Sequence, residues 1–139
     1  MKDDIPVYIL DSFAVLAYLQ EEAGADEVKA ILRQSLSKTC QVYFSIINLG
    51  EVIYITEREQ SLQKAQKTLA ALEQLPIQVL PASRGAVLAA AHIKARYPVA
   101  YADAFTIAAA QSMDGIILTG DPEFESVEQL VAVCWLREK

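Results

Sequence analysis

Short apolar runs alternate with longer stretches of helical periodicity along almost the whole chain, and this alternation constrains the fold more than any other feature. Val7-Tyr8-Ile9-Leu10 is a continuous apolar run of the length typical of a strand that is buried on both faces. We expect further strands at 42–44, 77–80, 116–118 and 131–135. Strands that are separated by helical crossovers pair in a mostly parallel sheet with helices on both faces. The sequence therefore predicts an α/β fold in the order βααβααβααββ.

Two helices are expected after each of the first three strands, with limits set by capping residues, glycine and proline. The first pair spans 13–22 and 26–36, with Gly24 between them and Asp26 as the expected N-cap of the second helix. Ser45 and Ser83 are expected N-caps of later helices, and an alanine-rich helix is expected over 101–111. Apolar residues at helical spacing predict the inner faces of the helices: Phe13, Leu16, Leu19, Val28, Ile31, Leu32, Leu36, Ile46, Leu49, Ile53, Leu62, Ala65, Leu69, Leu72, Val87, Ala90 and Ala91.

Length and charge limit the class of protein. A chain of 139 residues forms one domain, and we expect residues 1–139 to be a single unit. Hydrophobic residues make up 53% of the sequence and charged residues 22%, which excludes intrinsic disorder. The net charge of −6 argues against tight, non-specific binding to duplex nucleic acid, which needs many basic contacts to phosphate. It does not exclude a nucleic-acid enzyme in which a metal ion carries the local positive charge.

Cysteine and histidine are too few for a zinc site. Cys40 and Cys134 are far apart in sequence and His92 is the single histidine, so the usual closed site of cysteine and histidine ligands cannot form, whereas one disulfide stays open. The N-terminal residues do not fit a signal peptide, and no apolar stretch is long enough to span a bilayer. We therefore expect a soluble, cytoplasmic protein.

Four acidic residues occupy positions from which they can converge at the carboxyl edge of the sheet, where open α/β sheets bind ligands. Asp11 directly follows the first strand, Glu51 lies in the helix after the second, Asp103 lies in the first turn of the alanine-rich helix, and Asp121 follows the fourth strand. Glu51 and Asp103 have apolar neighbours and no lysine or arginine within six positions. A buried, unpaired carboxylate is costly, so these acids predict a hard divalent cation, Mg²⁺ or Mn²⁺.

Each acid also has an ordinary structural interpretation. Asp11 can cap a helix, Asp121 before Pro122 can form a turn, and Asp103 can favour the dipole of its helix. Glu51 is the hardest to explain in this way. The convergence of all four at one edge favours the functional interpretation.

Four short motifs, in order, resemble the PIN domain family, the metal-dependent ribonuclease fold of VapC-type toxins. They are Val7-Tyr8-Ile9-Leu10-Asp11-Ser12, Ser45-Ile46-Ile47-Asn48-Leu49-Gly50-Glu51-Val52, Tyr101-Ala102-Asp103-Ala104-Phe105 and Leu118-Thr119-Gly120-Asp121-Pro122-Glu123-Phe124. The resemblance covers nearly the whole chain. It implies a three-layer α/β/α sandwich with a mostly parallel five-stranded sheet.

The resemblance also implies roles for individual residues. Asp11, Glu51, Asp103 and Asp121 match the catalytic and metal-binding acids, and the hydroxyl groups of Ser12 and Thr119 match residues that orient those carboxylates or a metal-bound water. Glu123 stands where the family usually has Asp. Arg58 follows Glu51 by two helical turns and resembles a basic position that contacts phosphate. The implied activity is Mg²⁺- or Mn²⁺-dependent endoribonuclease cleavage by the toxin of a type II toxin–antitoxin pair, a homodimer inhibited by a small antitoxin.

Two other classes of function fit the sequence less well. A phosphohydrolase with Asp11 as nucleophile would need a second Asp where Phe13 stands, and a receiver domain would need an acidic pair at the end of the first strand, whereas Asp3 and Asp4 precede it. A non-catalytic interaction module with a PIN-like fold would not need four intact acids. Metal binding separates the enzyme from the module.

Overall fold

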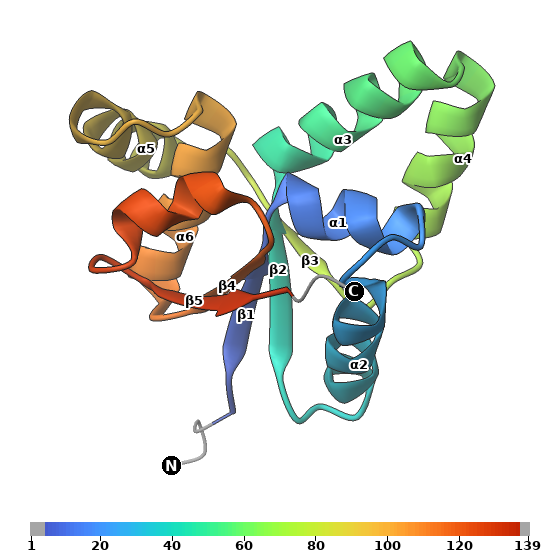
Figure 1. Cartoon of the computed structure of the whole chain (residues 1–139), viewed down its shortest axis with the longest axis horizontal. Helices are drawn as coiled ribbons and strands as arrows, with labels where there is room; N and C mark the ends of the chain where they lie inside the picture. Colours follow the sequence, from blue (N-terminus) through green and yellow to red (C-terminus); the bar gives the residue numbers. More distant parts are fainter. Residues whose placement is uncertain (1–4, 137–139) are drawn as a thin grey trace.

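Twelve elements follow one another in the computed structural model, which describes residues 5–136 (Figure 1). They are β1 (Val7–Leu10), α1 (Ser12–Leu19), α2 (Ala25–Leu36), β2 (Gln41–Ser45), α3 (Ile46–Glu59), α4 (Leu62–Leu72), β3 (Gln78–Leu80), α5 (Arg84–Arg96), α6 (Tyr101–Met113), β4 (Ile116–Thr119), the 3-10 helix η1 (Pro122–Val127) and β5 (Ala132–Trp135). The predicted order of strands and α-helices is confirmed. The short helix η1 was not predicted; Asp121 caps it and Pro122 begins it. Asp3 and Asp4 lie outside the described residues.

The sheet is parallel throughout, in the order β3-β2-β1-β4-β5. The chain builds from β1 outward through β2 to β3 and then returns to the other side of β1. The direction of winding therefore reverses between β1 and β4, which is where ligands bind in open α/β sheets. The predicted mostly parallel, five-stranded sheet is confirmed.

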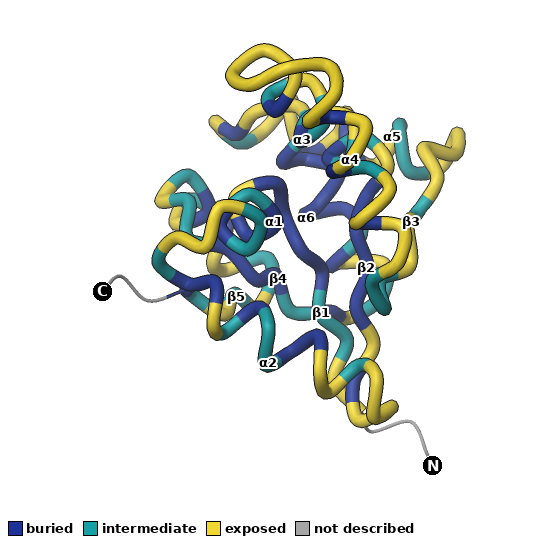
Figure 2. The backbone as a smooth tube through the Cα atoms, turned by 90° about the vertical axis from the view of Figure 1, so that its right-hand side faces the viewer, coloured by how far each residue is buried: buried dark blue, intermediate teal, exposed yellow. Residues whose placement is uncertain are grey.

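Helices cover both faces of the sheet and form two apolar cores. Ile9 and Ile117 point toward α5 and α6, where they pack with Phe105 and Ile107. The neighbouring residues Leu10 and Leu118 point to the other face and pack against α1 and α2. The alternation follows from the pleat of the strands, and it gives the expected three layers. Figure 2 shows that burial is greatest along β2, β4 and the middle of α6, whereas most of α4 is exposed.

The connection between α1 and α2 differs from the prediction. Helix α1 ends at Leu19, earlier than expected, and Glu21 has a left-handed backbone with φ of 54°. The N-cap of α2 is Gly24, with φ of 95°, and the prediction of Asp26 as the cap is wrong. Because the turn needs a left-handed residue, glycine takes the cap position and Asp26 falls within the first turn of the helix, where its charge favours the helix dipole.

Several residues expected on inner helix faces are exposed. Leu36 exposes 69% of its surface, and Phe13, Ile46, Leu62 and Ala91 are also exposed. Phe13, Leu36, Ile46 and Leu62 lie in the first or last turn of their helices, where the core no longer covers them. The buried stripe of α3 consists of Asn48, Val52 and Thr56 rather than Ile46, Leu49 and Ile53.

The two cysteines are free thiols, so the disulfide left open by the sequence does not form. Cys134 lies on β5, and Cys40 directly precedes β2, three strands away. Strands are spaced by about 4.8 Å, which separates the two residues by more than a disulfide can bridge. Within residues 5–136, every helix is too short or too polar to cross a bilayer.

Candidate active site

The register of the sheet brings the ends of three strands to one edge. Leu10 is paired with Phe44 on one side and with Leu118 on the other. The residues that follow them, Asp11, Ser45 and Thr119, therefore emerge at the same level. This edge is also where the winding of the sheet reverses, so the geometry of the backbone alone selects it as the place for a site.

Asp11 is held at this edge by two hydrogen bonds. Its Oδ1 accepts from the backbone N–H of Ala14 at 2.8 Å and so caps α1, and its Oδ2 accepts from the hydroxyl of Thr119. The residue exposes only 1% of its surface. Burial, with a smaller contribution from the charge of Asp121, raises the pKa of Asp11 to about 7, although the two hydrogen bonds act to lower it.

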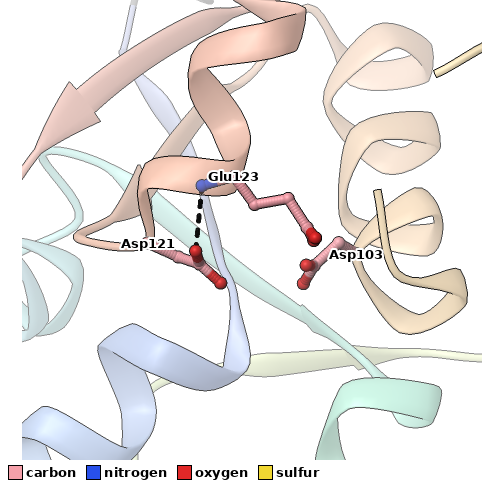
Figure 3. Close-up of side chains that lie close together, drawn as sticks. All are labelled: Asp103, Asp121 and Glu123. Carbon is pink, nitrogen blue, oxygen red and sulfur yellow. Dashed lines mark hydrogen bonds between the residues drawn. The ribbon is translucent and has the colours of Figure 1, made fainter. Parts of the chain in front are cut away.

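Three further carboxylates converge with one another (Figure 3), and the charge of Asp11 acts on one of them, Asp103. One oxygen each from Asp103, Asp121 and Glu123 can be chosen so that all three lie within 4.8 Å of one another. Asp103 comes from the first turn of α6, whereas Asp121 and Glu123 come from the start of η1. The Oδ1 of Asp121 accepts from the backbone N–H of Glu123 at 2.9 Å and so caps η1, and the Glu123 carboxylate extends toward Asp103.

The neighbouring carboxyl groups strongly shift one another's pKa values. Burial, a hydrogen bond to Glu123 and the charges of Asp11, Glu123 and Asp121 together raise the pKa of Asp103 to about 9. The same hydrogen bond lowers the pKa of Glu123, which also accepts from the backbone N–H of Ala100 at 2.9 Å. Without a cation, these opposite pKa shifts favour a state in which the two carboxyl groups share one proton.

This group of donors fits a hard divalent cation. Carboxylate oxygens are the ligands that Mg²⁺ and Mn²⁺ prefer, and three of them converge here from two elements. Asp103 exposes only 8% of its surface, and a cation would replace the proton that it otherwise needs. The raised pKa of Asp103 thus indicates that a bound cation would stabilise this group of carboxylates.

Glu51 is held apart from the three convergent acids by a buried polar network. The hydroxyl of Ser12 donates to the Oε1 of Glu51. Asn48 donates from its side-chain amide to the Ser12 oxygen at 3.1 Å and accepts from the hydroxyl of Thr106 at 2.9 Å. Asn48 and Thr106 are both fully buried, so the network ties α1, α3 and α6 together beneath the site.

The structure thus brings some of the predicted residues together and leaves others separate. Asp103 and Asp121 converge, and Asp11 lies close enough for its charge to act on Asp103. Glu51 contacts Ser12 and is not among the three convergent acids. Glu123, to which the sequence assigned no role, is one of those acids. Arg58 is exposed in the last turn of α3, with its guanidinium carbon 5.4 Å from the centre of the Tyr54 ring.

Sequence reasoning missed Asn48 and Thr106. Each is a polar residue among apolar neighbours: Asn48 follows Ile46 and Ile47, and Thr106 lies between Phe105 and Ile107. That local contrast was the available signal, because a polar side chain on the inner face of a helix needs a partner.

Comparisons with known proteins identify the fold of this chain. The family model described as PIN domain matches residues 8–130. A comparison with curated proteins finds no significant match.

Several solved structures have the same fold at low sequence identity. VapBC2 from Rickettsia felis, solved with a DNA fragment of its promoter, has a TM-score of 0.73 at 14% identity, and the match covers 94% of this chain and 99% of that one. DNA-bound VapBC from Salmonella typhimurium has a TM-score of 0.70 at 19% identity over 94% and 98% of the two chains. VapC20 from Mycobacterium tuberculosis, a toxin that cleaves the sarcin–ricin loop, has a TM-score of 0.67 at 18% identity over 87% and 94%.

Proposed function

Because the chain belongs to the PIN domain family, we propose that it is a metal-dependent endoribonuclease that hydrolyses phosphodiester bonds in RNA. One observation carries the proposal: a buried aspartate of raised pKa, Asp103, shares a narrow space with Asp121 and Glu123 at the edge where the sheet changes its direction of winding. A structural role alone gives no reason to crowd three carboxylates in this way.

In this proposal, Mg²⁺, or Mn²⁺ in its place, is held by Asp103 and Asp121 together with Asp11 and Glu123. When bound, such an ion supplies positive charge to the phosphate and lowers the pKa of a water molecule. Asp103 releases its proton when the ion binds, so metal binding is coupled to proton release. Thr119 keeps Asp11 oriented through its hydroxyl, and its oxygen also accepts from the backbone N–H of Asp121 at 2.9 Å.

The roles of the remaining site residues follow from their contacts. Ser12, supported by Asn48, fixes the direction of the Glu51 carboxylate, which we assign to the metal-binding set at a greater distance from its centre. Arg58 contacts a phosphate of the RNA away from the cleaved bond. Its guanidinium lies over the ring of Tyr54, one turn earlier in α3, and this contact holds it against the helix surface.

The biological role proposed is that of the toxin in a type II toxin–antitoxin pair. The support is the similarity in fold to VapC chains that were solved as VapBC complexes. The partners proposed are RNA as substrate, a small antitoxin that inhibits the enzyme and a second copy of the chain in a homodimer, all in the cytoplasm.

Cleavage of mixed RNA in Mn²⁺ or in EDTA, with mapping of the RNA ends, tests the proposal. The wild type should cut in Mn²⁺ and not in EDTA, whereas Asp103→Asn and Asp121→Asn should cut at least about 100-fold more slowly. Asp114→Asn is the matched control, because Asp114 is an exposed helix-capping residue on the far end of α6. Cleavage that persists in EDTA, or that Asp103→Asn and Asp121→Asn retain as Asp114→Asn does, would contradict a metal-dependent site here.

A further inference from the structure

Four side chains form a chain of hydrogen bonds beneath the acidic site, and every donor in it points the same way. Thr106 donates from its hydroxyl to the Oδ1 of Asn48 at 2.9 Å, and Asn48 donates from its amide to the Oγ of Ser12 at 3.1 Å. Ser12 donates in turn to the Oε1 of Glu51. Hydrogen bonds in such a series strengthen one another, and this series ends on a carboxylate.

The two inner members of the chain each lie one helical turn from an acid of the site. Thr106 follows Asp103 by three residues in α6, and Asn48 precedes Glu51 by three residues in α3. The hydrogen bond between Thr106 and Asn48 therefore joins the helix that carries Asp103 to the helix that carries Glu51. Any change in this bond alters the distance between the two helices directly beneath the two acids.

The burial of this pair is difficult to explain by stability alone. Asn48 and Thr106 both have an exposed fraction of 0%. Two apolar side chains of the same shape would fill the space with little or no loss of stability, because neither would need a partner. A hydrogen bond differs from an apolar contact in that it fixes both a distance and a direction. The polar pair thus suits a place where the spacing of two helices has to be closely defined.

We propose that Asn48 and Thr106 are positioning residues, whose hydrogen bond sets the spacing between the Glu51 and Asp103 carboxylates in the metal-binding set. The inference rests on the proposed function. Mg²⁺ requires near-ideal ligand geometry, so a shift of one acid relative to the other lowers the affinity of the site. Neither Asn48 nor Thr106 contacts the ion or the RNA, and both act through the acids one turn away.

Mn²⁺ binding to the RNA-free protein, followed by the electron paramagnetic resonance signal of the free ion, tests this inference without requiring cleavage. Thr106→Val removes the hydroxyl, and Thr106→Ser keeps it. The double variant with Asn48→Leu and Thr106→Val removes both polar partners, so that neither leaves the other unpaired. Thr56→Val is the control, because it removes another buried hydroxyl, from α3, that donates only to a carbonyl of its own helix.

We expect Thr106→Val to weaken Mn²⁺ binding by roughly tenfold or more, the usual effect of removing a group that orients a metal ligand. Thr106→Ser and Thr56→Val should bind Mn²⁺ as the wild type does. The double variant separates positioning from stability. Its urea midpoint in EDTA should lie closer to the wild type than that of Thr106→Val, whereas its Mn²⁺ affinity should remain as low. If the double variant does not fold, the difference between Thr106→Val and Thr106→Ser still reports on the hydroxyl.

Other outcomes overturn the inference. Thr106→Val that binds Mn²⁺ as tightly as the wild type, or a double variant that regains wild-type affinity together with its stability, would show that the pair serves stability alone. Cleavage of mixed RNA in Mn²⁺ by the same proteins separates this inference from the proposed activity. Mn²⁺ affinity that depends on Thr106, in a protein that does not cut RNA, would support the inference and refute the nuclease. Wild-type cleavage with an affinity independent of Thr106 would do the reverse.

Discussion

Replacing Asp103 by asparagine should stabilise the metal-free protein at neutral pH while abolishing its activity. The pKa of Asp103 is raised and that of Glu123 is lowered, so without metal the two carboxyl groups are expected to share one proton near neutral pH, with Asp103 as the donor. The side-chain amide of asparagine is nearly the same shape and donates in the same direction. The variant therefore keeps the hydrogen bond and removes the need to bind a proton from solution.

The magnitude follows from the raised pKa. The unfolded chain releases this proton above about pH 4, whereas the folded protein retains it up to about pH 9. Within that window the folded state binds more protons, so the wild-type free energy of unfolding falls as pH rises, by up to about 1.4 kcal/mol per pH unit. Asparagine does not bind a proton, so the variant lacks this contribution to the pH dependence of its free energy of unfolding. Between about pH 5 and pH 7 the advantage of the variant should thus grow by roughly 3 kcal/mol.

Urea unfolding in EDTA at several pH values from about 5 to 8 measures this difference. Asp11, whose pKa is also raised, remains in both proteins, so its contribution to the pH dependence largely cancels. The lowered pKa of Glu123 acts only below this range, where the carboxylate begins to be protonated in the unfolded chain. Asp114→Asn should show a difference from the wild type that does not vary with pH.

Parallel pH profiles for the wild type and Asp103→Asn would refute the reasoning, because they would mean that Asp103 ionises normally in the folded protein. A purely structural aspartate predicts a different pattern. Asparagine would then lower stability by about 0.3–1 kcal/mol at every pH in this range, through the lost interaction with the dipole of α6, and RNA cleavage would be unchanged.

Three further results are expected. Millimolar Mn²⁺ or Mg²⁺ should raise the melting temperature of the wild type, since bound metal relieves repulsion between the carboxylates. The melting temperature of Asp103→Asn should rise much less. Equal shifts in the two proteins would mean that the metal binds elsewhere. Thr106→Val should lower the free energy of unfolding by about 1–2 kcal/mol, because it leaves the buried amide oxygen of Asn48 without its donor. Thr56→Val should lower it less, since the Thr56 hydroxyl donates only to a carbonyl of its own helix. Equal losses in urea unfolding would exclude a stabilising role for the network. Gly24→Ala should destabilise the fold by about 1–3 kcal/mol, because a Cβ is disfavoured at a φ of 95° and would press against Leu136. Gly50→Ala, at an open helical position, should stabilise the fold by about 0.5–1 kcal/mol. Thermal melts that show the same change for both variants would contradict these backbone effects.

Most of the backbone could be predicted because its determinants are local. Val7-Tyr8-Ile9-Leu10 forms β1 over the expected residues, and Ser45 and Ser83 cap α3 and α5 as expected. The apolar periodicity of the sequence predicted burial less well at helix ends. Whether Leu36 or Ile46 is covered depends on what packs beside the last or first turn, and periodicity along the chain contains no information about that neighbour.

The candidate site divides in the same way. The position of Asp11 after β1 and of Asp103 at the start of α6 followed from element limits alone. The place of Glu123 did not, because it depends on the unpredicted turn of η1, which directs its side chain at α6. The separation of Glu51 from the three convergent acids depends on its bond to Ser12, which is distant in sequence.

The sequence by itself determined the order of strands and helices and the edge at which the acids gather, because apolar periodicity and the parallel direction of βα units are properties of neighbouring residues. Only the tertiary structure decided which carboxylates meet and how Asn48 and Thr106 join across fifty-eight positions. Those outcomes depend on strand order, register and the rotation of each helix about its axis. These quantities are set by contacts between residues far apart in the chain, and a single sequence does not encode them in any local pattern.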